Sequence, residues 1–194
     1  MKAFAFVLFA ALLIASPSGV QAAPPNFQTL LEEASATFAT PADFADVPVP
    51  DVPGFPFDRA VQTGAGSLRV LYAVRPISRM KIEYNDPHSS APHPDHIFPL
   101  VFETLVGNLS GGGNTPTRQF PEKEAKKRFG ADWASAATFD VDPEKFPGYN
   151  QGFLLAQHKA RKADLFTLFL YNDPALAKKR LDALLPSLSF RAGD

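Results

Sequence analysis

The chain has 194 residues with 45% hydrophobic residues, and its 19 basic residues nearly balance 20 acidic ones, for a formal net charge of −1 at pH 7. This length suits one domain with a sizeable core, and the balanced charge argues against a nucleic-acid partner because no strong field would attract one. Cysteine is absent, which excludes disulfides, thiolate metal sites, a thiol nucleophile and lipid attachment at a cleavage-site cysteine.

The first 22 residues have the pattern of a bacterial export signal. Lys2 gives a positive start, residues 4–15 form an apolar run, and residues 20–22 (Val-Gln-Ala) place small residues at a cleavage site. The apolar run is much shorter than the roughly 20 residues that a spanning helix needs. We therefore expect a signal peptide cleaved after Ala22, a periplasmic or secreted protein, and no transmembrane segment in the mature chain.

Residues 23–60 predict an N-terminal helix followed by a proline-rich strap. Apolar residues recur at helical spacing from Phe27 to Phe38, which predicts a short amphipathic helix. Residues 41–56 then contain several prolines, which lack the backbone donors that a helix or central strand requires. This segment has too many apolar residues for a free linker, so we expect it to lie against the domain.

Residues 61–194 predict a single α+β domain. Apolar and other residues alternate over residues 67–76, the pattern of a half-buried strand, and residues 80–84 continue the extended character. A helix is expected from Asp95 to Leu109, and the glycines at 111–113 predict a turn after it. Pro121 and Gly130 are placed to begin and end another short helix.

The C-terminal third predicts three strands, over residues 133–141, 151–158 and 165–171, and a final helix. The last strand is almost wholly apolar, so we expect it to be covered on both faces, with Phe166 and Leu168 in the core. The helix would begin after Asp173, bury Leu181 and stop at Pro186. The order of elements predicts an α+β fold in which helices pack on an antiparallel sheet.

This closing segment resembles a known family. The strand Leu-Phe-Thr-Leu-Phe-Leu at 165–170 and the helix ending Leu-Pro-Ser-Leu-Ser-Phe at 185–190 are similar to the C-terminal part of Mog1/PsbP-like proteins. The resemblance covers the last third of the chain and implies an α/β/α sandwich with an accessory or binding role and no shared active site. The proline-rich strap departs from the pattern expected for the family.

The most concentrated polar segment, residues 84–96, holds three of the four histidines and six residues of other kinds that can hydrogen-bond. Polar loops stiffened by proline are where binding often resides, so we predict a recognition surface here. The predicted binding residues are Tyr84, Asn85, Asp86, His88, His93, Asp95 and His96.

A metal site in this loop is the alternative. Imidazoles and a carboxylate from His88, His93, His96 and Asp86 form a ligand set that zinc or copper accepts. Prolines interrupt the segment, and the spacing matches no metal signature, so we expect no cofactor and a loop in which Asp95 helps to begin a helix.

Signatures of catalysis are weak. The chain contains no Gly-x-Ser-x-Gly motif, its glycine triplet lacks the Lys-Ser/Thr of a phosphate loop, and His158 is predicted to be a half-exposed strand residue. The sequence therefore predicts a non-enzymatic accessory or binding protein whose partner is a protein, an envelope component or a small ligand. The alternative is a metal-binding envelope protein that uses the His-rich loop.

Overall fold

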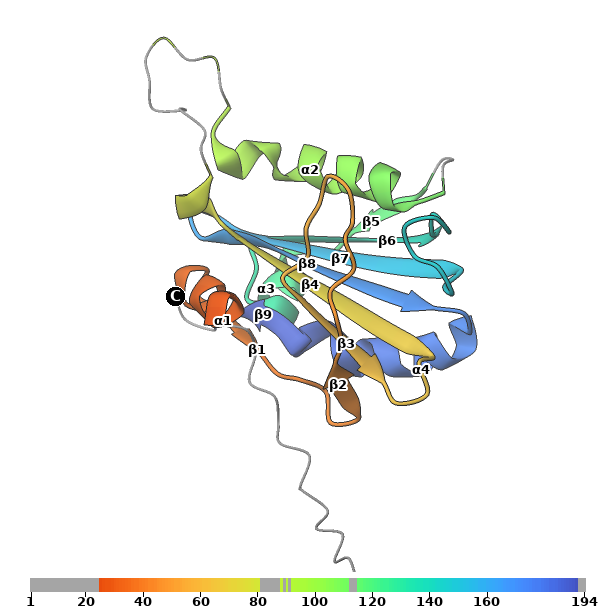
Figure 1. Cartoon of the computed structure of the whole chain (residues 1–194). Coiled ribbons are helices and arrows are strands. Elements are labelled where there is room, and N and C mark those ends of the chain that lie inside the picture. Colours follow the sequence, from red (N-terminus) through yellow and green to blue (C-terminus); the bar gives the residue numbers. More distant parts are fainter. Residues whose placement is uncertain (1–24, 81–87, 89, 91, 112–114, 192–194) are drawn as a thin grey trace, which may run out of the picture.

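A computed structural model of the protein describes residues 25–80, 88, 90, 92–111 and 115–191. They form an α+β fold with an antiparallel sheet, as the sequence predicts (Figure 1). The helices are α1 (Pro25–Glu33), α2 (Pro94–Leu109), α3 (Glu122–Phe129) and α4 (Pro174–Leu184), with short 3-10 helices η1 (Ile77–Arg79) and η2 (Leu185–Ser187). In this part of the chain no helix is long and apolar enough to cross a membrane.

The main sheet has the strand order β2-β3-β4-β8-β7-β6-β5, and every neighbouring pair is antiparallel. A separate pair joins β1 to β9, with Ala36 opposite Phe190. The strands are β1 (Ala36–Phe38), β2 (Phe44–Asp46), β3 (Arg59–Thr63), β4 (Leu68–Pro76), β5 (Thr117–Gln119), β6 (Trp133–Asp140), β7 (Gln151–Lys159), β8 (Ala163–Tyr171) and β9 (Leu188–Phe190).

Helices cover both faces of the sheet and create two cores. Helix α2 packs on one face, where Phe98 and Phe102 meet Phe166 and Leu168 of β8. Helices α1, α3 and α4 pack on the other face, where Leu30 and Phe129 belong to the second core (Figure 1). The buried positions of Phe166 and Leu168 confirm the prediction, whereas Leu181 is only partly buried.

Strand β4 is more buried than its sequence suggests. The prediction of a half-buried strand is wrong, because Leu71 and Ala73 lie in the core that the strap and α2 cover, while Val70 and Tyr72 face the other core. Leu71 and Ala73 are apolar and can be buried, whereas Arg69 and Arg75 at the ends of the same face stay partly exposed.

The N-terminal region joins the sheet at two places. Helix α1 ends at Glu33, earlier than predicted, because Ser35 adopts a left-handed backbone (φ 50°) and the chain continues into β1. The strap lies against the domain as expected, with Val52 2% exposed. It also contributes the short strand β2, which sequence analysis missed.

Candidate ligand-binding groove

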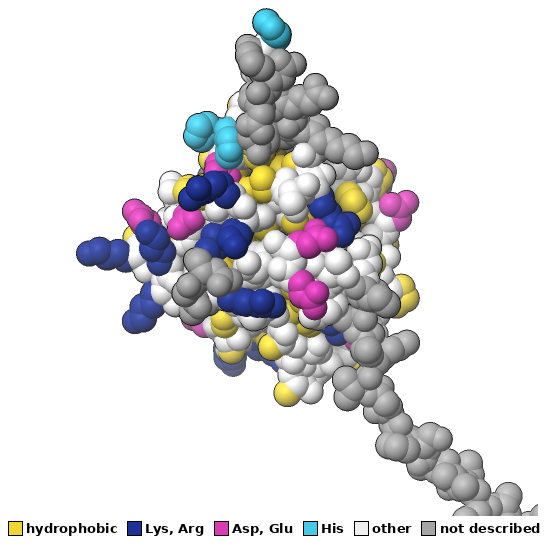
Figure 2. Space-filling view, turned by 90° about the vertical axis from the view of Figure 1, so that its left-hand side faces the viewer, with side chains coloured by type: hydrophobic (Ala, Val, Ile, Leu, Met, Phe, Trp, Pro, Cys, Tyr) yellow, Lys and Arg dark blue, Asp and Glu magenta, His cyan; other side chains and the backbone are white. Residues whose placement is uncertain are grey.

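The predicted recognition loop is only partly described. Tyr84, Asn85 and Asp86 lie outside the described residues. His88 and His96 are exposed, and the rings of His93 and His96 are 5.8 Å apart between centroids. Figure 2 shows the histidines (cyan) at one end of the molecule, in more than one place.

His93 and Asp95 have defined structural tasks. The Nδ1 atom of His93 accepts a hydrogen bond from the Asp95 backbone N–H at 3.2 Å, so this imidazole is the N-cap of α2. Asp95 lies in the first turn, as predicted, and its Oδ1 atom accepts from the Arg161 backbone N–H at 2.9 Å. Within the described part of the chain, no three His, Asp or Glu side chains are arranged to hold a metal ion.

The prediction of a half-exposed His158 is wrong. His158 is 6% exposed and its ring stacks on Phe98 at 5.0 Å between centroids. Its Nδ1 atom lies 2.7 Å from Asp164 Oδ1, and its Nε2 atom lies 3.7 Å from Asp95 Oδ1. Of these two contacts only the one to Asp164 is a hydrogen bond, and it holds the imidazole between β7 and β8.

Asp164 is almost completely buried beside this histidine. Burial raises the pKa of the Asp164 carboxyl, the hydrogen bond and charge of His158 act in the opposite direction, and the nearby Asp95 raises it further. Burial is the largest of these influences, so the ionised form of Asp164 is disfavoured despite its partner. Asp164 also forms part of the wall of a cavity.

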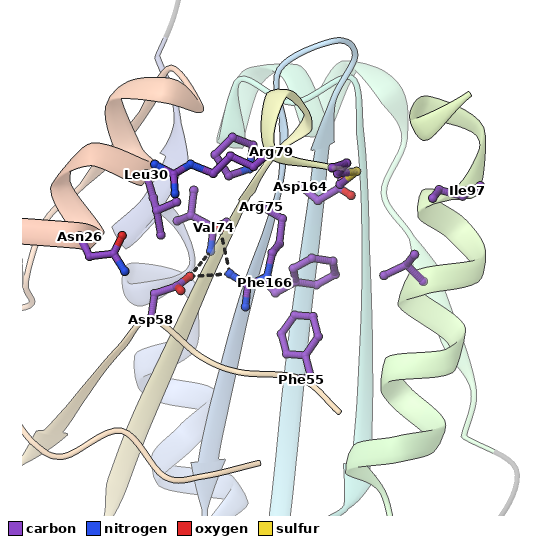
Figure 3. Close-up of a pocket in the computed structure, with 13 residues that line it drawn as sticks. Asn26, Leu30, Phe55, Asp58, Val74, Arg75, Arg79, Ile97, Asp164 and Phe166 are labelled. Carbon is purple, nitrogen blue, oxygen red and sulfur yellow. Dashed lines mark hydrogen bonds and ion pairs between the residues drawn. The ribbon is translucent and has the colours of Figure 1, made fainter. Parts of the chain in front are cut away.

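This cavity has a volume of about 440 Å³ and lies at the end of β4, between α1 and α2. Figure 3 shows Leu30 of α1 on one side and Ile97 of α2 on the other, with side chains of β4, β8 and the strap between them. Its apolar lining comes mainly from Leu30, Phe55, Val74, Ile97, Val101 and Phe166.

The cavity exists because β3 is shorter than β4. Strand β3 begins at Arg59, which pairs with Tyr72, so the register of β3 with β4 stops there. Beyond this point the Val74 backbone N–H donates to Asp58 Oδ2 at 2.7 Å, where a strand residue would otherwise accept. The sheet edge is therefore closed by a side chain, and the space beside it stays open.

Arg75 completes this edge. Its Nη1 atom donates to Asp58 Oδ2 at 2.7 Å (Figure 3) and to the Val74 carbonyl at 2.9 Å, and its Nη2 atom donates to the Pro56 carbonyl. The guanidinium also lies 5.0 Å from the Phe55 ring centroid. The Asp58 charge is thus balanced within the wall, and the strap is fixed to β4.

Arg79 differs from Arg75 because its side chain is 50% exposed. It makes a two-bond ion pair with Glu33 of α1, at 2.5 and 2.7 Å, and this pair lowers the pKa of Glu33. Arg79 lines the cavity, whereas Glu33 is not among its described lining residues. Exposed ion pairs contribute little free energy, so Arg79 can exchange this partner at low cost.

A second cavity, of about 470 Å³, continues from the first along α2. The two cavities share Phe55 and Val101, and the second extends to Asn108. Asn108 Nδ2 donates to the Pro53 carbonyl at 3.1 Å, and Gly54 turns the strap with φ 82°. We name the two cavities together the strap groove, since the strap forms one wall and α2 the other.

Apolar side chains in the strap groove are exposed to solvent. Leu100 of α2 lines it and is 69% exposed, and Ile97 and Val101 are partly exposed in the same groove. Of the predicted binding residues that the structure describes, none lines the groove. The only sequence signal for this site was the excess of apolar residues in the strap.

Comparisons with known proteins found no match: no protein-family model fits the chain, and no curated protein is significantly similar to it. The resemblance to Mog1/PsbP-like proteins therefore stays a prediction, and function has to be argued from the groove.

Proposed function

We propose that the protein is an exported, non-enzymatic binding protein whose strap groove takes a small ligand with a linear apolar body and one anionic group. The observation that carries the proposal is the continuity of the two cavities through Phe55 and Val101, with Arg79 at one end. Small-molecule sites are typically apolar clefts with a few well-placed polar groups, and the strap groove has this composition.

The shape of the groove favours a linear ligand. Its α2 wall runs from Ile97 to Asn108, and a helix rises about 1.5 Å per residue, so this wall is roughly 16 Å long. Phe55 and Val101 contribute to both halves, which suits an unbranched chain that passes between them.

The charges favour an anionic group. The two carboxylates of the wall already have partners, Asp58 with Arg75 and Asp164 with His158. Arg79 is the half-exposed cation, and its partner Glu33 comes from a neighbouring helix. An arginine whose ion pair is exposed can bind a carboxylate or phosphate through two parallel hydrogen bonds.

The lining also supports binding over catalysis. The described lining residues of the strap groove include no Ser, Cys, Lys or His, and its two carboxylates, Asp58 and Asp164, are bonded to Arg75 and His158. His158 does not line the groove, and its Nδ1 atom is paired with Asp164.

Calorimetric titration of the mature protein with octanoate, decanoate and dodecanoate tests the proposal. Each methylene removed from water contributes about 0.8 kcal/mol, so we expect the Kd to fall by up to roughly fourfold per carbon until the groove is full. Arg79→Gln should weaken all three ligands by a similar factor, because the anionic group is common to them.

Two further variants complete this experiment. Val101→Trp fills the junction of the two cavities and should abolish binding, whereas Glu103→Gln, on the exposed side of α2, should leave the Kd unchanged. A Kd that does not depend on chain length, or equal binding of dodecyltrimethylammonium, would contradict the proposal.

A further inference from the structure

The opposite face of the sheet carries a separate cavity of about 670 Å³ between α3 and α4. It shares no described lining residue with the strap groove. We name it the α3–α4 cavity. Its apolar surface comes from Phe153 and small residues of the sheet, such as Ala136, and from Leu181 and Leu185 at the other wall.

The cavity arises from the spacing of the two helices. Across its rim, Arg128 of α3 donates to Asp182 of α4 at 3.3 Å, and Asp182 is 88% exposed. Arg128 also pairs with Glu124 of its own helix at 3.1 Å. The two carboxylates that line the cavity, Glu124 and Asp182, are therefore both bound to Arg128.

Tyr171 points to a ligand at this place. It lines the cavity from the end of β8, and its side chain is buried, with the residue 4% exposed. Among the described residues its hydroxyl has no hydrogen-bond partner, and burial raises the pKa of the phenol. The hydroxyl oxygen is not among the fully buried polar atoms of the described structure, so it is accessible from the cavity and can donate a hydrogen bond to a ligand there.

Two cations on the rim have no counter-charge among the described residues. Arg118 of β5 and Lys178 of α4 are exposed, line the cavity, and form no ion pair with any residue that the structure describes. Arg118 and Lys178 come from different elements that border the cavity, so both positive charges face a ligand inside it. With Glu124 and Asp182 already bound to Arg128, the rim carries an excess of positive charge.

We propose that the α3–α4 cavity is a second binding site, which takes a small organic anion with an aromatic body and one carboxylate. The ring packs on Phe153 and Leu181, Tyr171 supplies a hydrogen bond from the wall, and Arg118 and Lys178 supply charge from the rim. The cavity volume lies in the range of small-molecule sites. This site is independent of the strap groove.

Titration with 1-naphthoate, followed by calorimetry, tests this inference in the Val101→Trp background, in which the strap groove is filled. We expect saturable one-to-one binding that weakens as salt is added. The double change Arg118→Gln with Lys178→Met should weaken binding at least tenfold and remove most of the salt dependence. Lys127→Met, a matched loss of an exposed lysine on α3, should leave the Kd unchanged.

Tyr171→Phe separates a ligand role from a structural one. Because the hydroxyl has no partner within the described structure, its removal should leave the thermal midpoint at or above that of the parent, while naphthoate binding weakens at least threefold. Absence of binding to the folded parent at millimolar naphthoate overturns the proposal. An unchanged Kd in the Arg118/Lys178 double variant also overturns it.

Discussion

The Nδ1 atom of His158 lies 2.7 Å from Oδ1 of Asp164, and the two side chains are only 8% and 2% exposed. They belong to opposite strands of the β7–β8 hairpin, where their Cα atoms are partners in the register. Asp95 approaches the other side of the imidazole from α2. The pair therefore connects the central hairpin to the helix that forms one wall of the strap groove.

Removal of His158 alone should lower the free energy of unfolding more than replacement of both His158 and Asp164 by apolar residues. His158→Phe keeps an aromatic ring beside Phe98 but leaves the buried Asp164 carboxyl without its hydrogen-bond partner, and we expect a loss of about 1–3 kcal/mol in the free energy of unfolding. The double variant His158→Phe with Asp164→Leu removes both polar groups and should recover much of this loss. Urea denaturation of the three proteins measures it, and equal losses in the single and double variants would contradict this account.

The raised pKa of Asp164 gives a pH dependence of defined sign. Because burial makes the pKa higher in the folded protein than the ordinary value of 3.8, the folded state retains this proton to higher pH than the unfolded chain does. The stability that this group contributes is full below pH 3.8 and is lost as the pH rises through the folded pKa.

Asp164→Asn removes this titration. We therefore expect the free energy of unfolding of the wild type, relative to Asp164→Asn, to fall as the pH is raised above 3.8. Chemical denaturation at intervals between about pH 3 and pH 7 measures the difference. A difference that rises with pH would show that the ion pair with His158 outweighs burial.

Because His93 is the N-cap of α2, its replacement should lower stability more than replacement of the exposed His96. His93→Ala should lower the free energy of unfolding by about 0.5–2 kcal/mol because α2 loses its cap, whereas exposed His96→Ala should change it by less than about 0.5 kcal/mol. Thermal melts of both variants and the wild type measure these effects.

The same melts test the metal alternative. A zinc or copper ion that binds His88, His93 and His96 only in the folded protein would raise the wild-type thermal midpoint by mass action, and chelator would reverse the rise. We expect no response to either treatment. A zinc-dependent rise that is lost in both variants would establish the metal site instead.

Export is tested by the mass of the mature protein. After expression of the full chain in a Gram-negative host, we expect the periplasmic fraction to contain a protein that begins at Ala23. Intact-mass spectrometry of that fraction measures this, and replacement of Ala22 by a bulky residue serves as the control because it should block cleavage. A cytoplasmic protein that retains Met1 would contradict the export prediction.

The central elements of the fold could be predicted because their signals are local. Strand β8 is apolar at nearly every position, which is what burial of both faces requires, and α4 begins where Asp173 caps it. The strands β1 and β9 were not predicted, since three-residue strands carry little pattern and Ala36 pairs with Phe190 across most of the chain. Such pairing depends on tertiary structure.

The candidate site was predicted less well than the fold. Sequence analysis chose the His-rich loop for its polar residues, but the strap groove is mainly apolar and forms only when Phe55 of the strap meets Val101 of α2. Similarly, His158 looked half-exposed because its strand alternates, whereas α2 covers that face and places Phe98 on the imidazole. Both features result from contacts between segments that are distant in sequence.

The pairing of β1 with β9 also sets an order of folding. β1 has no partner in the described structure other than β9, so this pair cannot form until residues 188–190 have left the ribosome. Contacts between such distant segments are slow to form, because a long loop must close before they contribute. The β1–β9 pair is therefore expected to form after the β7–β8 hairpin, whose strands are joined by a short turn.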